Sequence, residues 1–536
     1  MLKRLGVLLA FCCLFVVLGA CSEKTPSAST SASGDKKTLI IGMVNPPVSF
    51  NTIGNHDVAS QFVQGFVFDS LLDMEEPLVF LPKLAESFET TDNQTYTIKI
   101  HPDAEWSDGK PVSADDLMFT LNLIANTNVQ TEVGNYITQL EGVNESGKLE
   151  KGEEEISSLE KVDEKTVSFK TKQPVDPSML KEQLGVKLLI LPKHAFEGVS
   201  PADIGNAEFM RNPTITSGPF TFVDYKKDQY VQVEANKDYY RGEPKLDEVF
   251  IKVIPAPNLA AQLQAGEIHM NAPGGIGQIP VQDFGLVEGL DNVTTETYET
   301  IQFQTLMFNM ESIEDAKVRQ AIAYALNRQS LVDNLLKGAG EVIDGPYSNI
   351  NPYLNEEMEN YAFDADKAKQ LLEETDWDFN RVIKLIVPTG NNIREQSANI
   401  ISENLKDIGL KIEIVKYDFP TTMQKADEGE HDLLLMGFTL TLDPDVSAVY
   451  GADGPYNWMK YNNPVAQKLL EQGKAEPESE KRTTIFNELQ EVWQQDLPLI
   501  SLYSDNQLSA VSKDVSYGGP KPFGTLSELH QWDIEQ

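Results

Sequence analysis

The sequence has few cysteines, few histidines and almost no long apolar runs. Its three cysteines all lie within the first 21 of 536 residues, and its six histidines are scattered. It contains no His-Glu-x-x-His pair, no Gly-x-Ser-x-Gly elbow and no Walker phosphate loop. After the N-terminal segment, no stretch is long and apolar enough to span a bilayer. These absences remove the usual signatures of zinc proteases, α/β-hydrolases, P-loop enzymes and multispan membrane proteins.

The N-terminal segment predicts export. Residues 1–20 have the pattern of a signal peptide, because two basic residues precede an apolar stretch that ends in small residues. Residues 18–21, Leu-Gly-Ala-Cys, resemble a bacterial lipobox, which implies that the signal is cut before Cys21 and that this cysteine is lipidated. Residues 21–37 then read as a flexible tether. Because the other two cysteines would leave with the signal, we expect no disulfide, cysteine-ligated metal or catalytic thiol in the mature chain.

The charge balance is strongly acidic. The chain has 44 Lys and Arg residues against 82 Asp and Glu residues, a formal net charge of −38. Such a surface repels phosphate backbones, so we expect no nucleic-acid partner. Solubility is the ordinary explanation for this charge, and a preference for cationic ligands is the alternative. The hydrophobic content of 41% is ample for more than one domain.

The periodicity of apolar residues changes near residue 300. Before it, alternating residues predict short strands at 39–44, 95–101, 166–170, 231–235 and 248–254. A capping box at Ser113 predicts a helix, and the charge run 148–155 predicts a solvated loop. After residue 300, helical faces alternate with strand patterns, with a cap expected at Asp364 and a helix end at Gly409. The second half therefore predicts an α/β domain.

One stretch, from Asp432 to Asp445, carries the strongest local signal for a ligand edge. Residues 433–436 are apolar, and residues 438–442 then alternate as a half-buried strand does. Gly437 has no side chain, so another backbone can approach it closely. Pro444 cannot donate a ladder hydrogen bond, so regular pairing should continue to Asp443 and stop there. The stretch predicts a docking edge for an extended ligand, and an ordinary core strand followed by a turn is the alternative.

Several motifs occur in a fixed order along the whole chain after the tether. They are Leu84-Ala-Glu-Ser-Phe88, residues 95–100 (TYTIKI), 104–109 (AEWSDG), 113–116 (SADD), 217–220 (SGPF), 235–244 (ANKDYYRGEP), 265–267 (AGE), 308–309 (FN), 318–328 (VRQAIAYALNR) and 497–500 (LPLI). Together they resemble the extracytoplasmic solute-binding proteins of peptide ABC transporters, the family of oligopeptide-, dipeptide- and nickel-binding proteins.

The resemblance implies an α/β, periplasmic-binding-protein-like fold of type II in the large peptide-binding class. Two lobes joined by a hinge would close on a ligand, and one lobe would carry an inserted subdomain. By similarity, the parts are lobe I at residues 38–62, 205–296 and 508–536, the inserted subdomain at 63–204 and lobe II at 297–507.

The implied function is capture of peptides and their delivery to the permease subunits of an ABC importer. The protein would be a monomer, lipid-anchored on the extracytoplasmic face of a bacterial membrane, with the Ser/Thr-rich tether and acidic surface favouring a Gram-positive host. No catalytic residue, metal or cofactor is expected. The alternatives are a binder of a non-peptide solute such as a metal chelate, and a surface receptor or chaperone for signalling peptides; an enzyme comes third.

The candidate ligand-binding residues follow from the central stretch and from the resemblance. They are Phe50, Asn51, Thr52, Met436, Gly437, Phe438, Thr439, Thr441, Asp443, Tyr456 and Trp458. In the family, an acidic residue shortly before an Asp-Pro pair binds the peptide ammonium, but here Thr441 stands at about that position. Two hypotheses remain: Asp443 takes this role, or the peptide is held through backbone groups.

Overall fold

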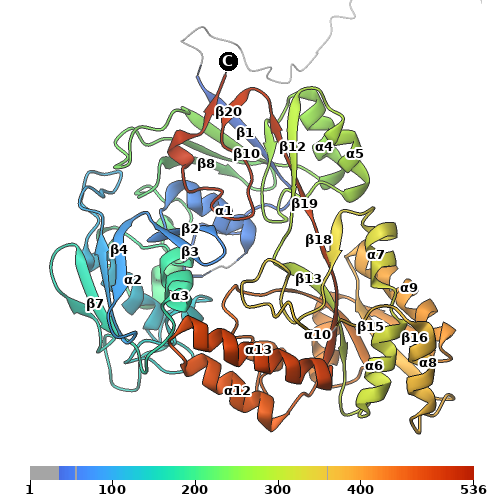
Figure 1. The fold of residues 1–536 in the computed structure, drawn as a ribbon. Coiled ribbons are helices and arrows are strands. Elements are labelled where there is room, and N and C mark those ends of the chain that lie inside the picture. The colour runs from blue at the N-terminus through green and yellow to red at the C-terminus, as the bar shows by residue number, and fades with distance from the viewer. Residues whose placement is uncertain (1–35, 55–56, 359, 536) are drawn as a thin grey trace, which may run out of the picture. The chain divides into compact units, whose positions relative to one another are not determined.

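The structure is a computed structural model that describes residues 36–54, 57–358 and 360–535 (Figure 1). The expected signal peptide, Cys21 and all but the end of the tether lie outside these residues. Within the described residues, no helix has the length and apolarity to cross a membrane. The same residues contain no group of three or more His, Cys, Asp or Glu side chains that could hold a metal ion.

A seven-stranded sheet is built from both ends of the described chain. Its order is β12-β19-β11-β1-β10-β9-β8. The bounds are β1 Thr38–Met43, β8 Phe220–Lys226, β9 Tyr230–Ala235, β10 Glu248–Val253, β11 Met270–Asn271, β12 Val293–Tyr298 and β19 Gln507–Ser512. β1 pairs in parallel with β10 along its length and with β11 on its other side. The strands expected at 39–44, 231–235 and 248–254 are confirmed.

Helices and small hairpins accompany this sheet. Helix α1 (Val58–Val67) contributes to the same apolar cluster as β1, whereas α4 (Ala256–Ala265) and α5 (Phe284–Glu288) contribute to another, which includes Leu508 and Ala510 of β19. Two further pairs of short antiparallel strands are the hairpin of β2 Leu72–Glu76 with β3 Val79–Pro82, and β20 Val515–Tyr517 with β21 Asp533–Ile534, which is separated from it by residues 518–532.

A separate four-stranded sheet has the order β4-β5-β7-β6. Its strands are β4 Ala85–Thr90, β5 Thr95–Ile100, β6 Glu160–Lys161 and β7 Thr166–Lys170, and the helices of this region are α2 Ala114–Ala125 and α3 Pro177–Leu180. The capping box at Ser113 is present, and residues 148–155 form turns and loops, both as expected. Side chains of this sheet share one buried cluster with the seven-stranded sheet.

A six-stranded sheet, ordered β14-β18-β13-β17-β15-β16, forms from residues after 300. The strands are β13 Gln302–Phe308, β14 Gly340–Val342, β15 Val382–Pro388, β16 Lys411–Tyr417, β17 Leu433–Thr439 and β18 Leu499–Asp505. Leu433 and Leu435 face one buried cluster, and Leu434 and Met436 face the other. This alternation is the strand period of two, and both faces of β17 are buried at its start.

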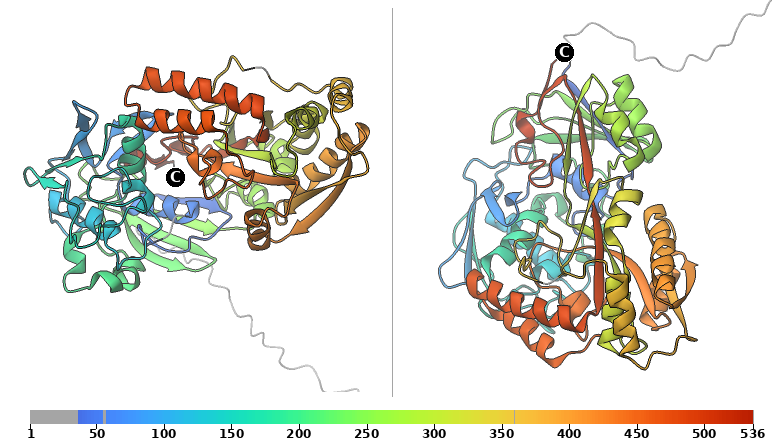
Figure 2. Two further views of the ribbon diagram at one scale, coloured as in Figure 1. Left: turned by 90° about the horizontal axis from the view of Figure 1, so that it is seen from below. Right: turned by 45° about the vertical axis from the view of Figure 1, so that its right-hand side comes forward.

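Helices cover both faces of this sheet. The first cluster includes side chains of α6 Ala316–Ala325, α7 Arg328–Leu335, α8 Ala365–Glu373 and α9 Asn392–Asp407; the second includes α10 Phe419–Asp427, α11 Ser447–Tyr450, α12 Pro464–Ala475 and α13 Ser479–Asp496. Helices α12 and α13 lie side by side (Figure 2). The cap at Asp364 and the left-handed Gly409 (φ 90°) occur as expected, so the α/β prediction is confirmed.

The end of β17 differs from the sequence prediction. Regular pairing was expected to reach Asp443, but β17 ends at Thr439. Thr439 pairs with Gln302, the first residue of β13. Because the partner strand starts there, residues 440–442 have no ladder to join, although their apolar alternation continues.

The chain crosses between the two large sheets at two short connections. Residues 299–301 lead from β12 to β13, and Asn506 leads back from β18 to β19. The Thr300 hydroxyl donates to the Asp505 carbonyl at 3.3 Å, which ties the two connections together. Beside them, burial and the neighbouring Glu341 carboxylate raise the pKa of Glu299. The lobe boundaries themselves stay a prediction.

Candidate functional site: the crevice at the end of β17

The connectivity of β15, β16 and β17 marks one position in the six-stranded sheet. β16 lies on one side of β15 and is parallel to it, and β17 lies on the other side, also parallel. From β15 the chain moves to the edge strand β16 and then returns past β15 to β17, so a topological switch point lies between β15 and β17. In open α/β sheets, ligands bind in the crevice outside the carboxyl ends of strands at such a switch point. Here that position lies beside residues 388–391, at the end of β15, and 437–441, at the end of β17, and we call this position the crevice.

The edge of β17 is open at this crevice. β17 pairs with β13 along all of its seven residues, but with β15 only at Leu433 and Leu434. Along 435–439, the described residues provide no second partner strand. Backbone groups on an unpaired edge are a template for an added extended chain. Four of the sequence candidates, Met436, Gly437, Phe438 and Thr439, lie on this segment.

One face of this edge carries a cation. A Cβ atom at Gly437 would lie 2.6 Å from the Gln304 amide nitrogen and 2.8 Å from an Arg394 guanidinium nitrogen, so only glycine fits without rearrangement. The Arg394 Nε donates to Gln304 Oε1 at 2.8 Å. Burial lowers the pKa of Arg394, and no carboxylate of the described residues forms an ion pair with it. A half-buried guanidinium without an acidic partner is suited to bind an anionic group.

Arg394 was not a sequence candidate. It lies in the first turn of α9, directly after the end of β15. The signal that could have identified it is its position after the strand-like run 382–388 and the turn residues Gly390 and Asn391. Recognising this signal requires knowing that β15 lies at the switch point, which the sequence alone does not reveal.

The other face of the edge carries aromatic side chains. The rings of Phe438 and Trp458 stack, with centroids 6.4 Å apart and an interplanar angle of 21°. Tyr456 lies 5.5 Å from Trp458, centroid to centroid, and is 44% exposed. The Trp458 indole N–H donates to Asp427 at 2.8 Å, which fixes this ring. Three sequence candidates therefore come together beside the open edge.

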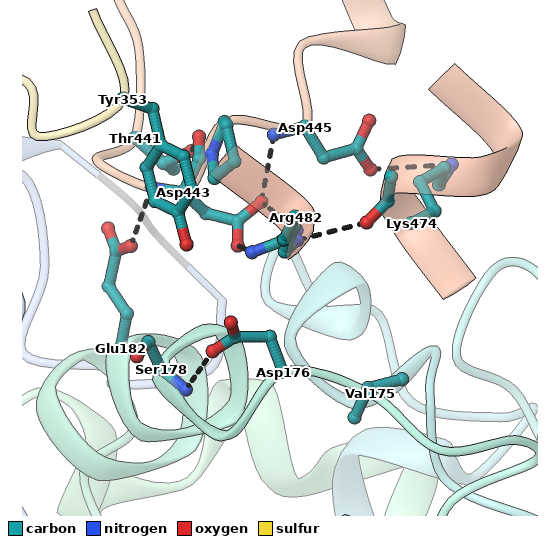
Figure 3. Close-up of polar contacts among 12 residues, drawn as sticks. Val175, Asp176, Ser178, Glu182, Tyr353, Thr441, Asp443, Asp445, Lys474 and Arg482 are labelled. Carbon is teal, nitrogen blue, oxygen red and sulfur yellow. Dashed lines mark hydrogen bonds and ion pairs between the residues drawn. The ribbon is translucent and has the colours of Figure 1, made fainter. Parts of the chain in front are cut away.

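Asp443 has a different environment from the one a peptide ammonium would need. Its carboxylate accepts hydrogen bonds from both terminal nitrogens of Arg482, at 2.7 and 3.1 Å, and one from the Asp445 N–H at 2.9 Å (Figure 3). The Asp443 and Arg482 side chains are 6% and 1% exposed. Burial opposes the charge of Arg482, but pairing with Asp443 raises its pKa. The carboxylate of Asp443 is thus occupied by an internal cation. Thr441 is exposed, and its hydroxyl donates to the Asp443 carbonyl.

The first-lobe candidates lie on other elements. Phe50 is 3% exposed and packs edge-on against Phe222 at a centroid distance of 4.9 Å. The Asn51 side-chain oxygen accepts from two backbone N–H groups of its own turn. Thr52 lines a cavity of about 250 Å³ together with Lys83 and other residues. In the described part of the chain, none of these three residues shares a hydrogen bond or ring contact with the β17 edge, and their ligand-binding role stays a prediction.

Comparison with known proteins gives a consistent result. The family described as bacterial extracellular solute-binding proteins, family 5 (middle part), matches residues 79–460. The oligopeptide-binding protein AppA of Bacillus subtilis is 29% identical, with 99% of this chain and 98% of that protein covered. Its solved structure, in complex with a nonapeptide, matches with a TM-score of 0.74 over 93% of this chain and 99% of that one.

Two further relatives extend the comparison. The ABC transporter substrate-binding protein CtaP of Listeria monocytogenes matches with a TM-score of 0.81 at 26% identity, covering 94% of this chain and all of that one. Heme-binding protein A of Haemophilus influenzae is 25% identical, with 97% and 98% of the two chains covered. The expected periplasmic-binding-protein-like α/β fold is confirmed by these structures.

Proposed function

Because the chain belongs to family 5 of the bacterial extracellular solute-binding proteins, which are binding proteins and not enzymes, we propose that it captures peptides in a cleft between two lobes and delivers them to an ABC importer. Cys21 would carry the lipid that holds the protein at the extracytoplasmic face of the membrane. The lobes are proposed at the residues expected from the resemblance, and the two short connections at 299–301 and 506 would act as the hinge.

The observation that carries this proposal is the open edge of β17. An extended peptide can pair its N–H and C=O groups with that edge whatever its sequence. Met436 to Thr439 would supply the backbone, and the Phe438–Trp458–Tyr456 face would contact a peptide side chain. The name of the Bacillus relative and its nonapeptide complex support a peptide ligand.

The charges at the crevice refine how the peptide would be held. Arg394 would bind a carboxylate of the ligand, because among the residues that the structure describes only the Gln304 side chain accepts a hydrogen bond from this guanidinium. Asp443 would not bind the ammonium, because Arg482 already occupies its carboxylate. Of the two hypotheses raised by the sequence, we therefore favour recognition through backbone groups.

Closure would couple binding to transport. A ligand stabilises the closed form by its greater affinity for that form, and the closed form would be the one delivered to the permease. No bond of the peptide is made or broken in this scheme.

Native mass spectrometry of protein purified from its host tests the ligand class. A ladder of peptide masses that disappears after partial unfolding and dialysis would support the proposal. One defined non-peptide mass would contradict it; a haem, as the name of the Haemophilus relative suggests, or a metal chelate would then be the ligand.

A second experiment tests the edge itself. Peptides carrying a single N-methyl group at successive positions each lose one donor and gain a steric block. We expect methylation at a few alternate positions to remove most of the peptide's affinity, because strand pairing uses the N–H groups of alternate residues. A uniform small loss at every position would contradict pairing with β17.

A further inference from the structure

Three polar contacts join the segment 63–204 to residues between 443 and 479, and none of the three involves the two short connections at 299–301 and 506. We call them the latch. The latch consists of the pairs Asp176–Ser479, Glu182–Asp443 and Asn93–Pro477.

The first pair connects the starts of two helices. Asp176 is 1% exposed and caps α3, because one of its carboxylate oxygens accepts from the Ser178 N–H at 2.8 Å. Its other oxygen accepts from the hydroxyl of Ser479, the first residue of α13, at 2.9 Å. A buried carboxylate therefore uses each oxygen for a different part of the chain.

The second pair uses a buried acid in a π-helical turn, Lys181–Lys187. Glu182 is 3% exposed; Oε1 accepts from Lys187 at 2.7 Å and Oε2 accepts from the Asp443 N–H at 3.3 Å (Figure 3). Arg482 holds the Asp443 side chain on the opposite side. The ion pair with Arg482 thus also holds Asp443 where its backbone N–H can donate to Glu182.

The third contact comes from turn tips. The Asn93 side-chain amide donates to the Pro477 carbonyl at 3.3 Å. Nearby in sequence, Leu78, at the tip of the β2–β3 hairpin, packs against the cluster that contains Trp493 and Phe486 of α13. Asn93 and Leu78 have positive φ angles, 57° and 59° respectively, a conformation that non-glycine residues adopt in tight turns. Two turns therefore extend toward the α12–α13 pair.

We propose that the latch holds the cleft closed independently of any contact that the ligand makes. This inference rests on the proposed hinge closure and adds a second set of residues to it. Asn93 and Asp176 of the segment 63–204 and Ser479 of α13 are not among the candidate ligand residues, and Asp443, which is, contributes only its backbone N–H to the latch. Because ligand affinity is scaled by the fraction of molecules in the binding-competent form, the latch would raise affinity by raising the closed fraction before a ligand arrives.

Ser479→Ala tests the latch with a matched control on the same chain. Ser200→Ala removes an equivalent bond, since the exposed Ser200 hydroxyl donates to Asp203 at 2.6 Å within residues 63–204. Two quantities are measured for each protein: the radius of gyration without ligand by X-ray scattering, and the dissociation rate of a randomised nonapeptide pool. We expect Ser479→Ala to give a larger ligand-free radius and dissociation about three- to tenfold faster, with Ser200→Ala like the parent protein.

A second variant separates the latch from simple loss of stability. Asp176→Ser keeps a helix-capping side chain but shortens its reach to Ser479. Combined with Ser479→Ala, it should produce no further opening, because both changes break one bond. Additive effects, or a ligand-free radius unchanged in Ser479→Ala, would overturn the latch. If no peptide binds to any of the proteins, the proposed function fails, but the ligand-free scattering still decides the inference.

Discussion

Two arginines, one beside β17 and one beside the residues that follow it, differ in what surrounds their charge. Arg482 is 1% exposed and is held in a forked pair by Asp443, whereas Arg394 is half-buried and has a neutral amide, Gln304, beside it. An arginine whose guanidinium is already paired with a carboxylate stabilises the structure and is not available to a ligand. An arginine with an unfilled fork is available. Thus Arg482 should matter for folding and Arg394 for binding.

The largest expected effect is on the free energy of unfolding when the Arg482–Asp443 ion pair is broken. Arg482→Met should lower the free energy of unfolding by about 3–5 kcal/mol, because it leaves the Asp443 charge buried without its partner. Urea denaturation followed by circular dichroism measures this loss. The double variant Arg482→Met with Asp443→Leu should recover most of it, since neither charge is then buried alone. A loss below about 1 kcal/mol in the single variant would show that the pair is solvated in solution.

The next largest effect is expected on peptide affinity when Arg394 is replaced. Arg394→Gln should weaken the binding of peptides with a free carboxylate by about 10- to 100-fold, the range expected for one charge-assisted hydrogen bond. Isothermal titration calorimetry measures the change, and the melting temperature should stay that of the parent. Arg381→Gln is a matched control, because Arg381 is paired with Asp432. Equal losses for C-terminally amidated peptides would remove Arg394 from carboxylate recognition.

Asp443→Asn sharpens the comparison from the acid's side. Because its carboxylate is occupied by Arg482, we expect any loss of affinity to be the same for free-amine and N-acetylated peptides. Competition binding with matched peptide pairs measures the difference. A selective loss for the free amine would restore the ammonium-binding role that the sequence alone suggested for this residue.

The smallest effect concerns the acids beside the two short connections. Burial and Glu341 raise the folded-state pKa of Glu299, so the folded protein binds this proton more readily than the unfolded chain does. The contribution of Glu299 to stability is therefore unfavourable at neutral pH and is relieved as pH falls through the raised value toward its ordinary pKa. Glu299→Gln should make the melting temperature depend less on pH between pH 7 and about 4.5. An unchanged pH profile would contradict this.

Much of the fold could be predicted because its signals are local. The alternation at 95–101, the capping box at Ser113, the cap at Asp364 and the left-handed Gly409 each depend on a few neighbouring residues, and each occurs as expected. A docking edge at Gly437 was also predicted from local residues, and its use by a ligand stays a prediction. What the sequence could not show is where β17 ends, because that depends on the first residue of β13, more than a hundred positions away.

The same limit applies to the site. Asp443 looked available because its partner Arg482 is distant in sequence, and Arg394 looked ordinary because its position at the switch point depends on strand order. Side chains that meet through tertiary contacts leave no periodicity in the sequence. The resemblance to a family supplied the fold class, but its usual acidic residue has no counterpart at Thr441.

The late position of two interior strands has a consequence for how the chain is made. β18 lies between β14 and β13, and β19 lies between β12 and β11, yet both come from residues 499–512. A chain emerging from the ribosome therefore lacks an interior strand of each large sheet until residues 499–512 have been synthesised. Such non-local pairing delays folding. Until β18 and β19 are made, the two sheets cannot be completed and the chain would stay unfolded. An unfolded chain is the form that passes through a membrane channel.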